Sequence, residues 1–249
     1  MVEIAWVISV ILLGTFVQGL TGFGLALVSV PLLSLLLNVK VAVPLAGLFG
    51  WIITFPLVFR MRQHVQWRTA LLMVIGSLPG SWLGASLLKL MPARYVLIVM
   101  GGVLVASSIH AISKRGAVMS GLESGIFPVG AGFLSGTLGA SVGEPGPPAI
   151  AFTSMQPWTS DQIKASLLFF FLLQMVGAII GFWSKGLLSA EVFSLFAWGI
   201  PSFIVGLTAG IKAWDLLKIY RFNYHRWVHG FLFCIGSFIL IRNIFFSHE

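Results

Sequence analysis

The chain has 249 residues, of which 58% are hydrophobic and 9% are charged. A soluble domain carries about 25% charged residues, so this composition excludes a water-soluble protein and predicts a polytopic integral membrane protein. The net charge of +8 does not indicate nucleic-acid binding, because the 15 basic residues lie in short loops between apolar segments. Cys234 is the only cysteine, which excludes an intramolecular disulfide and indicates no metal cluster.

Eight apolar segments follow one another, at 4–37, 41–59, 69–88, 95–112, 126–155, 165–183, 192–210 and 227–241. The N-terminus has neither a positively charged stretch nor a clear cleavage site, so we expect the first segment to be retained rather than removed as a signal peptide. Most of the segments suit a single span of about 20 residues, but the first and the fifth are too long for one.

These two long segments carry the same glycine pattern, 117 residues apart. The spacing F-x-x-G-x-x-G occurs at 16–22 and at 133–139, followed at equal distances by Pro31 and Pro148. Glycine and proline interrupt helices. At membrane depth an interrupted helix is tolerated only where its free backbone is buried or lines a cavity. Paired interruptions in two halves of a chain are typical of a transporter binding site.

Other similarities extend the repeat to two halves, 1–118 and 119–249. A Gly-x-x-x-Gly pair after a proline occurs at 80–84 and again at 206–210, and a basic–aromatic–valine triplet precedes the last apolar segment of each half. Such glycine pairs let membrane helices approach closely, and we interpret 80–84, 177–181 and 206–210 as packing devices.

The distribution of basic residues favours one topology. If each long segment crosses once, the basic residues divide seven to eight between the two sides; if each enters and returns as a hairpin, they divide ten to five. The positive-inside rule favours the hairpins. Each half then has three further crossings, so the halves point in opposite directions and both termini are extracytoplasmic. We therefore predict an all-α polytopic membrane protein of two inverted repeats, each a glycine-broken hairpin plus three transmembrane helices.

Glu144 is the single acidic residue inside an apolar segment, apart from segment ends. Because a carboxylate at membrane depth costs about 2.5–3.5 kcal/mol on insertion scales, its default interpretation is functional. Burial favours the neutral form of a carboxyl group, so proton coupling is one hypothesis. The alternative is a solvated side chain, if the surrounding proline-rich bend reaches the membrane interface.

Residues 139–143 spell G-x-S-x-G, the pattern of a hydrolase nucleophile elbow. That motif needs a strand–turn–helix context that an all-helical protein lacks, so an intramembrane serine hydrolase using Ser141 is kept only as an alternative. Gln174, near the middle of its segment, is either a ligand or an interhelical hydrogen-bonding group. Lys164 begins the same segment and is interpreted as an interfacial lysine whose charge reaches toward water.

The two glycine-rich segments with their prolines, in halves of four segments each, resemble the TauE/SafE sulfite-exporter family over nearly the whole chain. The resemblance implies secondary transport of a small anion containing sulfur or a carboxylate, such as sulfite or a sulfonate, with export more typical than uptake. The chain departs from the family where Ser141–Gly146 replaces a run of glycines and puts a carboxylate beside the expected anion site. Protonation of Glu144 on substrate binding would remove that conflict.

We expect the site to lie between the two hairpins, in the plasma (inner) membrane, with a small anion and the lipid bilayer as partners. No cofactor, metal ligand, catalytic residue or nucleic acid is expected. Glu144 is the expected proton carrier. The expected substrate-binding residues are Gln18, Gly19, Thr21, Gly22, Gly24, Ser135, Gly136, Thr137, Gly139, Ser141 and Gln174.

Overall fold

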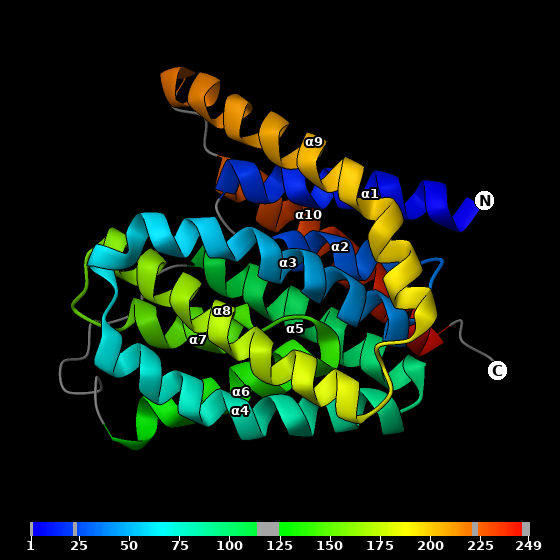
Figure 1. Ribbon diagram of the computed structural model, residues 1–249, viewed down its shortest axis with the longest axis horizontal. Helices are drawn as coiled ribbons and strands as arrows, with labels where there is room; N and C mark the ends of the chain where they lie inside the picture. Colours follow the sequence, from blue (N-terminus) through cyan, green and yellow to red (C-terminus); the bar gives the residue numbers. More distant parts are fainter. Residues whose placement is uncertain (1, 22–23, 114–124, 221–223, 246–249) are drawn as a thin grey trace. The chain divides into compact units, whose positions relative to one another are not determined.

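A computed structural model describes residues 2–21, 24–113, 125–220 and 224–245 (Figure 1). These residues are helical apart from short connections, as the composition predicts, and contain no strand. The elements are α1 (Val2–Thr21), α2 (Leu25–Leu33), α3 (Val39–Met61), the short η1 (Arg62–His64), α4 (Trp67–Leu90), α5 (Ala93–Ser113), α6 (Ile126–Val142), α7 (Gly146–Ser154), α8 (Ser160–Ser184), α9 (Ala190–Tyr220) and α10 (Tyr224–Phe245).

Both long apolar segments are split into two helices, as predicted. The first break lies at the end of the glycine pattern, whereas the second lies at 143–145, after a pattern that stays inside α6. In the first, Trp6 Nε1 donates to the Leu32 carbonyl over 2.9 Å, while Leu25 at the other end of α2 bonds to Gln18. Early residues of α1 therefore lie beside late residues of α2, so α2 returns along α1. In the second segment, α7 packs against α6 after the break. The first segment therefore folds back on itself as the hairpin interpretation requires, and its course through the membrane stays a prediction.

The chain forms two compact units, and each combines segments of both sequence halves. Unit 1 comprises Met1–Phe49, Pro92–Lys114 and Leu188–Glu249; unit 2 comprises Gly50–Met91 and Arg115–Leu187. The first helix break therefore belongs to unit 1 and the second to unit 2.

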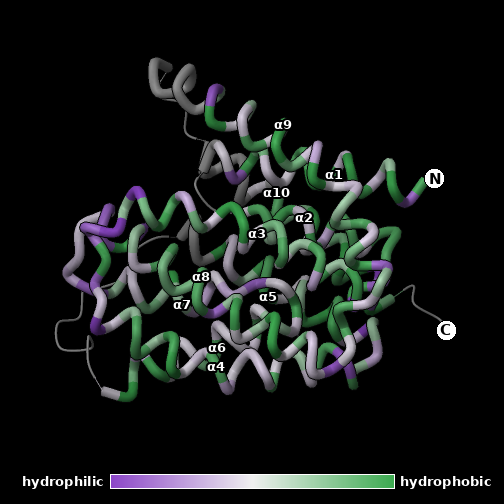
Figure 2. Tube along the Cα trace, viewed as in Figure 1, coloured by the Kyte–Doolittle hydropathy of each residue, from purple (hydrophilic) through white to green (hydrophobic). Residues whose placement is uncertain are grey.

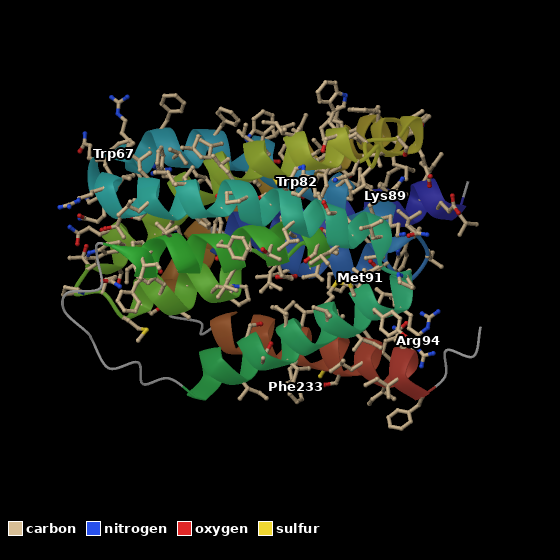
Figure 3. All side chains as sticks on the ribbon, turned by 90° about the horizontal axis from the view of Figure 1, so that it is seen from below. Trp67, Trp82, Lys89, Met91, Arg94 and Phe233 are labelled. Carbon is tan, nitrogen blue, oxygen red and sulfur yellow. The ribbon has the colours of Figure 1, made fainter. Side chains whose placement is uncertain are left out.

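In unit 1, α1 lies side by side with α9 (Figure 1). Gly206 and Gly210 of α9 face the backbone carbonyls of Leu12 and Phe16, and a Cβ at either glycine would overlap those oxygens. The second helix pair of unit 1 is α5 with α10. There Arg94, at the start of α5, donates from Nε to the Asn243 carbonyl over 2.9 Å and so binds the last turn of α10 (Figure 3).

In unit 2, α4 packs against both α6 and α8. Gly76 and Gly80 of α4 face the carbonyls of Val129 and Phe133 on α6, again with no room for a Cβ. Trp67 and Trp82 of α4 are about half exposed (Figure 3). Leu71, Ile75 and Leu78 are similarly exposed, which suits a face in contact with lipid.

The same contact is thus made once in each unit. Leu12 and Phe16 stand 117 residues before Val129 and Phe133, the spacing of the repeated motif, and each pair receives two glycines four residues apart. A Cβ on Gly84 would likewise overlap the Thr137 carbonyl, so a packing role is confirmed for Gly80, Gly84, Gly206 and Gly210. The division of the chain into halves 1–118 and 119–249, and their inversion, remain predictions.

Within the part of the chain that the structure describes, five helices are long and apolar enough to cross a membrane: Val2–Gly19, Val39–His64, Trp67–Leu90, Ser160–Ser184 and Ala190–Ala213. Hydrophobic residues dominate the described helices, and hydrophilic ones gather near helix ends such as η1 (Figure 2). The apolar segment 192–210 is shorter than its helix, because α9 continues ten residues beyond position 210 to Tyr220. Lys212, Asp215 and Lys218 end the apolar run there, but charged residues do not end a helix.

Candidate functional site: two broken helices

The first break lies between α1 and α2 in unit 1. Gly24 precedes α2 with φ 110° and ψ 3°, a left-handed conformation that glycine adopts at little cost. The Leu25 N–H donates to Gln18 Oε1 over 2.7 Å, and the Gln18 side chain is 7% exposed. Gln18 therefore caps the second helix of its own hairpin from the preceding helix.

The start of α2 retains backbone donors. The first four N–H groups of a helix have no acceptor within the helix; here they belong to residues 24–27, since the Val28 N–H is the first to bond, to the Gly24 carbonyl over 3.1 Å. The Leu25 N–H is bonded to Gln18, whereas no bond within the helix uses the N–H groups of Ala26 and Leu27. Both of these residues are partly exposed. Two N–H groups and the positive end of a helix dipole suit an anion.

The second break, in unit 2, has different chemistry. Gly143 ends α6 with φ 80° and ψ 12°, and its N–H returns to the Gly139 carbonyl over 3.1 Å, the αL type of helix end. The four positions that open α7 are Pro145, Gly146, Pro147 and Pro148. Proline has no N–H group. The start of α7 therefore carries one backbone N–H group, on Gly146, whereas the start of α2 carries four, one of which is bonded to Gln18.

Glu144 lies in this second break and is 1% exposed. Neither of its carboxylate oxygens has a hydrogen-bond partner among the described residues. This burial argues against the alternative of a solvated carboxylate. A buried, unpaired carboxyl group is costly, and such groups are maintained where they take up a proton or a cation.

Gln174 of α8 reaches the same break. Its side chain is 2% exposed, and Nε2 donates to Ser81 Oγ of α4 over 3.1 Å. A Cβ built on Gly139 would lie 3.0 Å from Gln174 Nε2 and 2.9 Å from Pro145 Cβ. Gly139 thus makes room for both the carboxamide and the turn that carries Glu144. The structure brings together Gly139 and Gln174, two of the expected site residues.

Two further predicted glycines, Gly19 and Gly136, are engaged in packing. A Cβ built on Gly19 would lie 2.9 Å from Gly210 Cα, and a Cβ built on Gly136 would overlap the Ser77 carbonyl. Gly19, Gly136 and Gly139 lie inside α1 and α6, where N–H groups bond to the preceding turn. N–H groups without an acceptor inside a helix lie instead at the start of α2.

Three hydroxyl groups of the second hairpin differ in their bonding. Ser141 Oγ donates to the Thr137 carbonyl over 2.6 Å, and Thr137 Oγ1 to the Phe133 carbonyl over 2.9 Å, so both bond within α6. Ser135 Oγ is fully buried without a partner among the described residues. Ser141 lies in a helix, with no strand before it, and the G-x-S-x-G pattern is therefore not a nucleophile elbow here.

Gly22 lies outside the described residues, as does the side chain of Thr21. Sequence reasoning missed Ser81 and Gln156. Gln156, two residues after α7, is 2% exposed, and its Oε1 has no partner among the described residues. Neither residue stands in a motif; the one available signal was a polar residue inside or beside an apolar segment.

Two helices broken at related motifs, with buried polar groups at the breaks and several apolar helices long enough to span a bilayer, define a multi-pass membrane protein of the transporter class. The chain matches the family described as Sulfite exporter TauE/SafE over residues 7–239. It belongs to that family, as its motifs predicted. Membership indicates anion transport and excludes the serine hydrolase.

A relative from Cupriavidus necator is named "Probable sulfite/organosulfonate exporter TauE". It is 27% identical over 206 residues, which cover 79% of this chain and 78% of the relative. No solved structure matches the chain.

Proposed function

We propose that the chain is a secondary transporter that exports a small oxyanion, sulfite or a sulfonate or a related organic acid, across the plasma (inner) membrane with proton coupling. The observation that carries the proposal is Glu144, a buried carboxyl group without a described partner, located at a helix break of an anion-transporter family. The printed name of the relative from Cupriavidus necator supports the class of anion.

In this proposal the anion is bound by neutral donors. In unit 1, the N–H groups at the start of α2 that the helix does not use are the donors to anion oxygens, and Gln18 holds α2 in place. In unit 2, the carboxamide of Gln174 is the donor. Ser135, whose buried hydroxyl has no described partner, supplies another. Neutral donors suit a cargo that must be released again, because they bind an anion less tightly than paired positive charges do.

Glu144 carries the proton in the proposal. A carboxylate would repel an anion held nearby in a medium of low dielectric constant, whereas a protonated carboxyl group would not. Proton uptake on one side of the membrane and release on the other then couples anion movement to the proton gradient.

Reconstituted liposomes test the proposal. Wild-type protein should accumulate sulfite or methanesulfonate in response to a pH gradient and should also catalyse counterflow. Glu144→Gln, which mimics the neutral side chain, should lose the response to the gradient and keep counterflow. Glu191→Gln, at an exposed position on α9, is the matched control and should behave as wild type. A wild-type gradient response in Glu144→Gln would remove this residue from the coupling.

The proposal includes the topology, with inverted repeats and both termini outside the cytoplasm. It is supported by the ten-to-five distribution of basic residues and by the return of α2 along α1. A reporter that is active only in the cytoplasm, fused after Glu249, should be silent in a membrane-inserted fusion. Activity of such a fusion would contradict this orientation.

The direction of transport is tested separately, in liposomes that contain the protein in one orientation. Transport of the anion from the cytoplasmic face of the protein to the opposite face should be faster than transport in the other direction. The reverse result would indicate uptake.

A further inference from the structure

Three helices of unit 2 meet around Ser81. The helix that carries it, α4, approaches α6 through Gly80, where a Cβ would overlap the Phe133 carbonyl. On the other side of α4, two glycines of α8 face it. A Cβ on Gly177 would lie 3.6 Å from Ser81 Cβ, and a Cβ on Gly181 would lie 3.0 Å from Ala85 Cβ. Glycines on both sides thus bring two neighbouring helices close to one buried serine.

The hydroxyl of Ser81 is used differently from its neighbours. Ser77, one turn earlier on α4 and also fully buried, donates to the Val74 carbonyl of its own helix over 2.8 Å. Ser81 Oγ instead accepts the hydrogen bond from Gln174 Nε2, across the interface with α8. It donates no hydrogen bond to a described residue, so its own proton stays available.

This bond orients the carboxamide of Gln174. One N–H of Nε2 is held by Ser81, and the same nitrogen lies beside Gly139 and the turn at Pro145. Because the amide group is planar, fixing the direction of one N–H also fixes the direction of the second. A side chain with several rotatable bonds loses that freedom before any ligand arrives, which lowers the entropic cost of binding.

We infer that Ser81 is a positioning residue for transport: its Oγ holds Gln174 as a hydrogen-bond donor to the oxyanion at the second helix break. The inference rests on the proposed function, because it takes Gln174 to contact the anion. A purely structural role, in which the pair only joins α4 to α8, gives no dependence of anion affinity on Ser81.

Counterflow in reconstituted liposomes, with sulfite and with methanesulfonate, separates these roles. Ser81→Ala should raise KM for both anions about three- to tenfold, the effect of one lost hydrogen bond, and leave the maximal rate within about twofold. Ser77→Ala is the matched control, with the same change at an equally buried position of the same helix, and should leave KM unchanged. Ser81→Cys keeps the shape with a weaker acceptor and should raise KM in the same direction.

A double-mutant cycle tests whether Ser81 acts through Gln174. Ser81→Ala combined with Gln174→Ala should bind the anions no more weakly than Gln174→Ala alone. An unchanged KM in Ser81→Ala, an equal change in Ser77→Ala, or an added effect in the double variant would overturn the inference. Loss of the folded protein in both Ser81 variants would assign a structural role and would also overturn it. Failure of the wild type to move either anion contradicts the proposed function itself, and is recognised before any variant is compared.

Discussion

The helix that follows the first break opens with four residues that all carry an N–H group, whereas the helix that follows the second opens with three prolines and one glycine. A neutral carboxamide caps the first, and an unpaired carboxyl group lies beside the second. Yet the glycines before the two breaks pack in the same way, on a helix with small residues. The repeated motif therefore preserves helix packing, while the residues just after it have diverged in chemistry.

If the first break binds the anion through its backbone, removing one N–H there should have the largest effect. Ala26→Pro gives α2 a proline at its second residue, where α7 has Pro147, in a first turn where proline fits a helix. We expect KM for sulfite to rise about tenfold or more, as for a hydrogen bond to a charged group. The counterpart Pro147→Ala should change KM less than twofold.

The measurement is counterflow in liposomes, with circular dichroism to confirm that both variants keep their helical content. Equal effects of Ala26→Pro and Pro147→Ala would show that the two breaks contribute alike and would remove the contrast between them.

The packing shared by the two units makes a second prediction. Gly80→Ala and Gly210→Ala each place a Cβ against a backbone carbonyl, and overpacking of this kind costs about 1–3 kcal/mol. Both should lower Tm by about 5 °C. Gly130→Ala in unit 2 and Gly102→Ala in unit 1 are controls, because a Cβ there has nothing within 4 Å. Thermal unfolding of the purified proteins measures the change, and a decrease in one unit alone would mean that the shared contact is unequal in strength.

The smallest expected effect concerns the cap of α2. Gln18→Leu removes the acceptor of the Leu25 N–H, and loss of a helix cap costs about 0.5–2 kcal/mol. Tm should fall by a few degrees. Gln18→Glu keeps an acceptor and should retain more of the stability, but its charge should raise KM for the anion. A Gln18→Glu variant with wild-type KM would indicate that the anion does not approach the first break.

Local patterns predicted the local features of this molecule. The glycine spacing at 16–22 located the first helix break, whereas the spacing at 133–139 lies inside α6, one turn before the second break. A single acidic residue in an apolar segment identified Glu144, which the structure buries. The sequence alone did not reveal that Gly139 accommodates the side chain of Gln174, because that contact joins residues 35 positions apart. Ser81 was missed for the same reason, since its partner lies 93 positions along the chain. Such contacts depend on helix packing, which periodicity does not encode.

The pairing of α1 with α9 has a consequence for synthesis. A ribosome that has finished α1 at Thr21 must add about 200 more residues before α9 ends at Tyr220, which takes roughly 10–40 s at about 5–20 residues per second. Unit 2, whose segments end at Leu187, can assemble earlier. Throughout that interval α1 lacks its partner α9, and the insertion machinery or the lipid must cover the face of α1 that later packs against α9.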